Sequence, residues 1–293
     1  MSKQRLADHN TQIVLLTIGV AAFLTKLFHM YVMLKRRLPS KNYLFITGYV
    51  VATLIASIGY MSSSGRRLRV LNGNIIASTK LECFMYAFHL SAFPFSDVLT
   101  TMCLFWLAME HMLAACFPDL YAKLTSAVLK VLTAMSIVVS LAITMFSWIY
   151  MLQTRDQHVS ASCKLHECTA PWIYTVVYIV PLFFIIMAMI LHVATAVFVK
   201  LIQRQNSMLY AELLHHVQRV SYIITTIFVT FMAERLIQLL HVPDAYREVV
   251  ATMLWTFSGL NLSIQSVVYI YAYPDLRAEA RKVFNACRCK FKW

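Results

Sequence analysis

Long apolar stretches alternate with short polar connectors along most of this chain. A helix needs about 20 mainly apolar residues to cross a bilayer core, because each residue advances it by only about 1.5 Å. Seven stretches reach that length: residues 13–34, 43–61, 81–116, 126–152, 171–201, 217–240 and 249–273. The third is longer than one crossing requires, so we expect it to tilt or to continue beyond the lipid. The pattern predicts an all-α membrane protein with seven transmembrane helices.

Composition and charge agree with a membrane protein. Of the residues, 60% are hydrophobic and 13% are charged, whereas soluble domains carry about 25% charged residues. The net charge of +13 fits basic cytoplasmic loops that face anionic lipid, so we expect no nucleic-acid partner. The distribution of Lys and Arg favours an N-terminus outside, although the basic run RRLR at 66–69 falls on the outer side.

Three cysteines lie on the predicted outer side, where disulfides persist. Cys83 is near the outer end of the third stretch, and Cys163 and Cys168 lie in the following outer loop. We expect a disulfide from Cys83 to Cys168, which is closer to the fifth stretch, with Cys163 as the alternative partner. The rival interpretation of the loop is a zinc site that includes His166, but structural zinc usually needs four ligands in two compact pairs.

Two further cysteines, Cys287 and Cys289, follow an amphipathic tail in the segment CRCKFKW. Cysteines in such a place near a membrane can carry palmitate. The alternative is that they are reduced thiols without a function, and the sequence leaves both interpretations open.

Charged groups inside the apolar stretches are candidate functional residues, because such groups are costly in lipid and usually face the bundle interior. Asp97 lies in the outer half of the third stretch, Glu234 and Arg235 lie in the sixth, and Lys26 and His29 lie one turn apart in the first. We expect Asp97 to contact a ligand, and we also expect a contact between Asp97 and Arg235. The alternatives are that Asp97 makes a structural hydrogen bond and that the sixth stretch ends before Glu234.

The sequence carries no motif of a membrane enzyme. It has no HExxH pair, no G-x-S-x-G turn and no phosphate-binding glycine loop, which are the usual marks of metal, nucleophilic and nucleotide chemistry. We therefore expect a protein that is not an enzyme and needs no cofactor or metal.

Two motifs resemble those of rhodopsin-like G-protein-coupled receptors. Glu110, Pro118 and Tyr121 have the spacing of that superfamily's D/E-R-Y-x5-P-x2-Y motif, and Asn261–Tyr269 is similar to N-S-x-x-N-P-x-x-Y. The segment at 275–286, which begins DLRAEARKVF, resembles the superfamily's short amphipathic eighth helix. The likeness covers nearly the whole chain. The chain's short termini are similar to those of nematode serpentine chemoreceptors. The last part of the first motif, FP-x-x-Y at residues 117–121, is similar to the sx class of those receptors.

The chain departs from the superfamily at several motif positions. His111 stands where the superfamily has arginine, Gln265–Ser266 replaces the N-P pair, and Ala52 replaces an aspartate of the second helix. Imidazole cannot form the bidentate fork of arginine and is charged only when protonated. These departures put coupling through His111 in question, but not the helical architecture.

The resemblance implies a single receptor domain over residues 1–293 in the plasma membrane of chemosensory cilia, with its N-terminus outside. Such a receptor would serve olfaction or a related sense, bind an extracellular small molecule or short peptide, and open a cytoplasmic groove to a heterotrimeric G protein. The implied ligand-binding residues are Phe93, Asp97, Arg235 and Trp255. The implied coupling and switch residues are Glu110, His111, Tyr121, Asn261 and Tyr269. The alternatives are a seven-helix transporter or channel-like protein and a receptor partner that does not signal.

Overall fold

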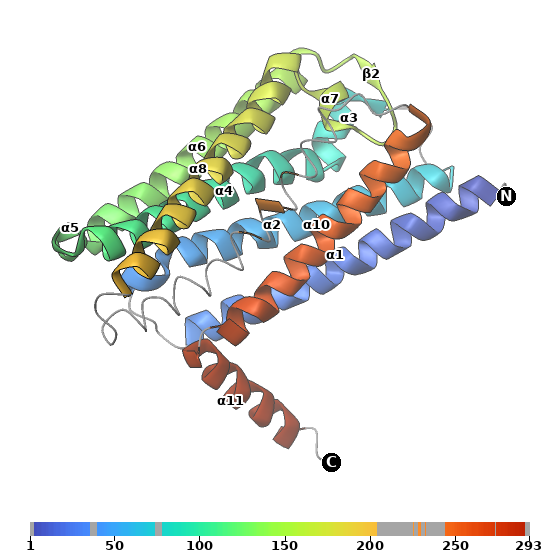
Figure 1. Cartoon of the computed structure of the whole chain (residues 1–293). Coiled ribbons are helices and arrows are strands. Elements are labelled where there is room, and N and C mark those ends of the chain that lie inside the picture. The colour runs from blue at the N-terminus through green and yellow to red at the C-terminus, as the bar shows by residue number, and fades with distance from the viewer. Residues whose placement is uncertain are drawn as a thin grey trace.

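The computed structural model describes residues 3–35, 40–73, 78–203, 244–272 and 274–290, together with four single positions at 225, 228, 229 and 232. These residues form a bundle of long helices with short elements at its ends (Figure 1). The long helices are α1 Lys3–Lys35, α2 Ser40–Leu71, α4 His89–Cys116, α6 Ser126–Gln153, α8 Pro171–Gln203 and α10 Asp244–Ala272. The short elements are β1 Ser78–Thr79, α3 Lys80–Tyr86, α5 Pro118–Lys123, β2 His158–Val159, α7 Leu165–Cys168 and α11 Pro274–Lys290.

Five of these helices are long and apolar enough to cross a membrane: Asp8–Lys35, Leu44–Leu71, His89–Cys116, Ser126–Gln153 and Pro171–Leu201. The outer faces of α6 and α8 expose large apolar side chains, for example Val138 at 63% and Phe183 at 56%. A continuous apolar outer surface suits lipid and not water. The predicted all-α, multi-pass membrane protein is therefore confirmed in its broad form, with two-residue strands as its only β-structure among the described residues.

Two of the seven predicted spans remain predictions. The sixth, residues 217–240, lies outside the described residues apart from four single positions. The seventh corresponds to α10, whose 29 residues are enough for a crossing, but α10 is not among the five apolar helices. Its polar residues Asn261, Gln265 and Ser266 are buried against the bundle.

Neighbouring helices in the first half of the chain run antiparallel. Between α1 and α2, Gly19 faces Met61 and Lys26 lies over Tyr49. The pairing continues in the same way from α2 to α4, where Gly48 faces Cys103 and Gly59 faces Ala92. It continues again from α4 to α6, where Trp106 donates a hydrogen bond to Ser136. At the other end of the same pair, Trp148 donates to Ser91. Each connection therefore returns the chain across the bundle.

The helices α8 and α10 run in the same direction, although they follow each other in the described chain. Phe105 of α4 contacts Phe184 of α8, and Ala115 packs with Val199, so α8 is parallel to α4. On the other side, α10 is parallel to α1, because Gly259 lies against Ile18 and Tyr269 against His29. The described chain thus stops at residue 203 at one end of the bundle and resumes at residue 244 at the other (Figure 1).

The predicted third span is interrupted. Instead of one helix over 81–116, the chain forms α3, bends at Ala87 and Phe88, and then forms α4. Thr79 starts α3 with a capping box in which its side chain accepts from Glu82 N and the Glu82 carboxylate accepts from Thr79 N. No Gly or Pro marks the bend, so the hydropathy pattern alone could not locate it. The excess length is a separate helix at the end of the bundle.

The second span is longer than predicted, because α2 continues ten residues beyond 61 to Leu71. The tail helix is confirmed as α11, which begins at Pro274. Glu279 on α11 pairs with Lys282 at 3.2 Å and with Lys35 at the end of α1 at 3.6 Å. These ion pairs place α11 at the same end of the bundle as the C-terminus of α1.

Candidate functional site

The cap is the group of short elements β1, α3, β2 and α7, which covers the end of the bundle where α1 begins (Figure 1). The strands β1 and β2 pair antiparallel, with Ser78 opposite Val159. A disulfide joins Cys83 of α3 to Cys163, 80 residues later. The cap therefore ties the loop that precedes α8 to the entrance of α4.

The expected pairing of Cys83 with Cys168 is wrong, and the alternative partner, Cys163, forms the bond. His89 at the start of α4 explains the choice, because its Nε2 donates to the carbonyl oxygen of Cys163 at 3.0 Å and holds that residue beside α3. Cys168 is a free thiol, fully buried in the same apolar cluster as the disulfide. Since the Cys163 sulfur is bonded to Cys83, it is not a thiolate that could bind zinc with His166.

Arg66 is one of the three cations in the basic run that opposed the predicted orientation. The residue is only 8% exposed, and its guanidinium donates from Nε to the Ala161 carbonyl at 2.8 Å and from Nη2 to Ser78 Oγ at 2.7 Å. Its charge is thus used to join α2, β1 and the loop after β2. Basic residues that are structural in this way carry little information about topology.

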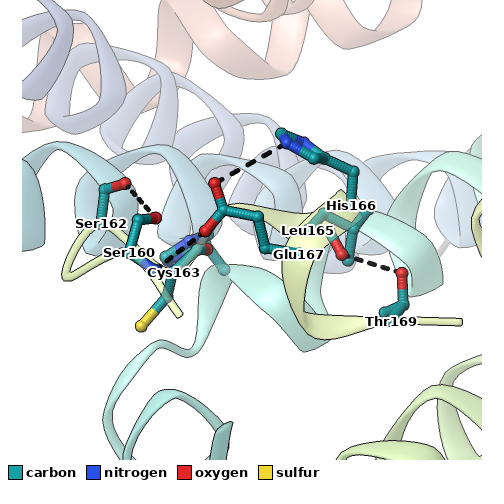
Figure 2. A network of polar contacts seen from close by, with 8 residues as sticks. Ser160, Ser162, Cys163, Leu165, His166, Glu167 and Thr169 are labelled. Carbon is teal, nitrogen blue, oxygen red and sulfur yellow. Dashed lines mark hydrogen bonds and ion pairs between the residues drawn. The ribbon is translucent and has the colours of Figure 1, made fainter. Parts of the chain in front are cut away.

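A polar network organises the outer surface of the cap (Figure 2). The Glu167 carboxylate accepts from Ser160 N at 3.0 Å and lies 3.8 Å from His166. Although partial burial opposes its charge, the hydrogen bonds from Ser160 lower the pKa of Glu167 below its ordinary value. Ser160 also bonds to Ser162 at 3.0 Å. The adjoining hollow of 440 Å³ is lined by Lys80, Gln157, His158, Val159, Ser160 and Glu167.

An aromatic cluster lies beneath the cap and joins three helices. Phe93 of α4 and Trp255 of α10, both predicted ligand-binding residues, meet edge to face with ring centroids 5.6 Å apart. Tyr60 of α2 contacts both rings, at 5.3 Å from Phe93 and 5.6 Å from Trp255. The Arg67 guanidinium lies 4.7 Å above the Trp255 ring. The structure therefore brings two of the predicted residues together with an aromatic and a cation from α2.

Asp97 lies one turn further along α4 than Phe93 and is partly buried. Its backbone carbonyl accepts from Thr101 Oγ1 at 2.9 Å. Arg235 and Glu234 lie outside the described residues, so the expected contact between Asp97 and Arg235 stays a prediction.

The opposite end of the bundle holds the predicted coupling residues of α4. Glu110 and His111 are buried at 7% and 8% exposure, so they do not simply solvate the end of the helix. Tyr121 of α5 donates to Glu110 Oε1 at 3.4 Å, a long hydrogen bond. Partial burial and the neighbouring Glu110 carboxylate raise the pKa of Tyr121. Pro118 begins α5, where a missing N–H costs nothing, and so positions Tyr121 beneath α4.

The last two predicted switch residues, Asn261 and Tyr269, are buried on α10. The Tyr269 ring lies 5.1 Å from His29 of α1. Beside them, Tyr49 of α2 donates to Gln265 Oε1. Residues 261–269 are thus part of a contact among α1, α2 and α10, in which Gln265 accepts a hydrogen bond from Tyr49.

Sequence reasoning missed four residues of these sites: Tyr60, Arg66, Arg67 and His89. The signal for the two arginines was present, since both are cations on the predicted outer side, where they contradicted the charge bias. No comparable signal marked Tyr60 or His89, whose roles depend on contacts with Trp255 and Cys163 that are distant in sequence. The side chains of Cys287 and Cys289 lie outside the described part of the structure, so their lipidation stays a prediction.

Comparison of the sequence with models of protein families found no match, and comparison with curated proteins found none either.

Proposed function

We propose that this chain is a chemosensory receptor of the plasma membrane that binds an extracellular small molecule or short peptide and signals to a heterotrimeric G protein. The observation that carries the proposal is the aromatic cluster of Tyr60, Phe93 and Trp255 beneath a cap anchored by a disulfide. Ligand sites are commonly apolar, formed between helices and fixed by a few polar groups.

The helix directions support seven crossings. The described part of α8 ends at one end of the bundle and α10 begins at the other, which supports one further crossing between them. The apolar stretch at 217–240 lies in this interval and is long enough for one crossing. Seven crossings with the N-terminus outside would leave the C-terminus in the cytosol, in keeping with the basic tail.

The two ends of α4 would then be coupled. Phe93 is near its outer end and Glu110 near its inner end, so a ligand that shifts α4 against α2 or α10 would also change the contact between Glu110 and Tyr121. A ligand drives such a change only by its differential affinity for the two arrangements. Release of Tyr121 would open a cytoplasmic groove for a G-protein helix, with His111 as the neighbouring polar group.

The proposal is tested by nucleotide exchange on a Gα subunit in membranes, after an agonist has been found by screening odorants and peptides. Trp255→Leu should raise the agonist concentration for half-maximal exchange by at least tenfold, since it removes two ring contacts and one cation–π contact. Phe257→Leu is the matched control, because Phe257 is two residues away on α10 and 64% exposed. Equal losses in the two variants would contradict the proposed ligand site.

Asp97→Asn tests the more specific prediction. It should weaken the agonist response at normal surface expression if the carboxylate contacts the ligand or Arg235. An unchanged response would remove Asp97 from the site without affecting the aromatic cluster. Substrate flux into proteoliposomes without any G protein would instead support the alternative of a transporter.

A further inference from the structure

Two basic side chains of α1 are fully buried in the middle of the bundle. Lys26 and His29 both have 0% exposure and lie one turn apart within the span Asp8–Lys35. The Lys26 ammonium is 5.0 Å from the centre of the Tyr49 ring of α2, and His29 faces Tyr269 of α10. Both side chains therefore point between α2 and α10, away from lipid.

Neither side chain has a hydrogen-bond partner among the described residues. The atoms concerned are Lys26 Nζ and both ring nitrogens of His29. The Ser266 hydroxyl on α10 is also buried without a hydrogen-bond partner. The parallel register that sets Gly259 against Ile18 and Tyr269 against His29 brings Ser266 level with Lys26. Tyr49 does not satisfy the ammonium, because its hydroxyl donates to Gln265. The unsatisfied donors of α1 and α10 thus lie at the same level of the bundle.

The charge at this place is also unbalanced. No acidic side chain of the described residues forms an ion pair with Lys26: Glu279 pairs with Lys35 and Lys282, and Glu110 lies beside Tyr121. A buried ammonium normally requires an opposite charge and full hydrogen bonding. Buried donors left without partners in this number indicate a bound ion or ordered water.

We propose that Lys26, His29 and Ser266 form an intramembrane site for a small monovalent anion, chloride under physiological conditions. Its charge balances the Lys26 ammonium, and it accepts hydrogen bonds from the ammonium, from an N–H of His29 and from the Ser266 hydroxyl. The ligand is small because the three groups that would hold it are closed to solvent: Lys26 and His29 are 0% exposed and Ser266 is 1% exposed. The anion joins α1 to α10 and stabilises this side of the bundle.

The test is the thermal stability of the purified full chain in detergent, with chloride replaced by gluconate at constant ionic strength. Saturating chloride should raise Tm by about 5 °C, because a ligand at 100 times its Kd stabilises the folded state by RT ln 101. Bromide should act like chloride, and gluconate should be too large. An increase that saturates distinguishes a specific site from a general salt effect.

Lys26→Met should abolish the chloride-dependent increase while leaving a folded protein, since Met preserves the length and the apolar packing of the stem. Ser266→Ala should weaken it by several-fold in apparent Kd, which provides a second variant if Lys26→Met does not fold. Lys35→Met is the matched control, because Lys35 is exposed at the end of the same helix. Equal stability of the unmodified chain in chloride and gluconate, or a chloride effect that persists in Lys26→Met, would overturn the proposal.

Discussion

Replacing Arg66 with Met should open the cap. The guanidinium makes two hydrogen bonds that join α2 to the loop after β2 and to β1, and it is largely protected from solvent. A hydrogen bond to a charged group contributes about 1.5–3 kcal/mol, so the two bonds together contribute at least about 3 kcal/mol to holding the cap closed. Met fills the space of the aliphatic stem and leaves the carbonyl of Ala161 and the hydroxyl of Ser78 without this partner.

The free thiol of Cys168 reports the opening. Cys168 is fully buried in the closed cap, so alkylation requires local opening, and its rate follows the population of the open state. A loss of about 3 kcal/mol increases that population about a hundredfold, because each 1.4 kcal/mol is a factor of ten. Peptide mapping by mass spectrometry after timed alkylation measures the rate at Cys168 separately from the other cysteines.

Arg69 provides the matched control, since it belongs to the same basic run but is exposed. Arg69→Met should leave the alkylation rate of Cys168 within about twofold, because exposed charges contribute little to stability. If Arg66→Met and Arg69→Met alkylate at the same rate, Arg66 does not hold the cap, and its position on the outer side again argues against the proposed orientation.

Three further predictions follow from the packing and the titrating groups. Gly48→Ala should lower Tm in detergent, because the new Cβ would lie 2.8 Å from the Cys103 sulfur, and adding Cys103→Ala should restore most of the loss. Burial and the neighbouring Glu167 raise the pKa of Cys168 from 9.0 to about 11. The protonated thiol therefore stabilises the closed cap fully below pH 9, and this stabilisation is lost as the pH rises towards 11. Because the cap then opens more often, a phosphine should reduce the Cys83–Cys163 disulfide faster over this range. Cys168→Ser should remove the acceleration. Glu110→Gln should raise nucleotide exchange without ligand, because it weakens the contact with Tyr121. Asp119→Asn, an exposed change on α5, should leave this basal rate unchanged. Equal basal rates in the two variants would show that Glu110 is not part of the switch.

The apolar pattern was sufficient to predict the long helices, because each crossing requires a fixed length of apolar residues wherever it lies in the chain. It could not predict the bend at Ala87 and Phe88. That bend depends on the capping box at Thr79 and on the disulfide from Cys83, and the hydropathy of this stretch does not change there. The end of α2 was placed too early for a related reason, since Arg66 and Arg67 of the basic run are satisfied by contacts and need no polar loop.

The candidate site was predicted in part. Phe93 and Trp255 were expected to face one site, and they do meet, because the positions of α4 and α10 follow from the predicted helices. Their partners Tyr60 and Arg67 could not be found from the sequence, since they depend on the rotation of α2 about its axis. The choice of Cys163 over Cys168 likewise depends on the hydrogen bond from His89, a contact between segments that are 74 residues apart.

The central claim is that the chain crosses the membrane an odd number of times, with the cap outside and α11 in the cytosol. Single cysteines introduced at Arg155, next to the cap, and at Lys282, on α11, can be labelled in intact cells with a thiol reagent that does not cross membranes. The account predicts labelling at position 155 in intact cells and labelling at position 282 only after permeabilisation. Labelling of both positions in intact cells would contradict the seven-helix arrangement and the receptor function with it.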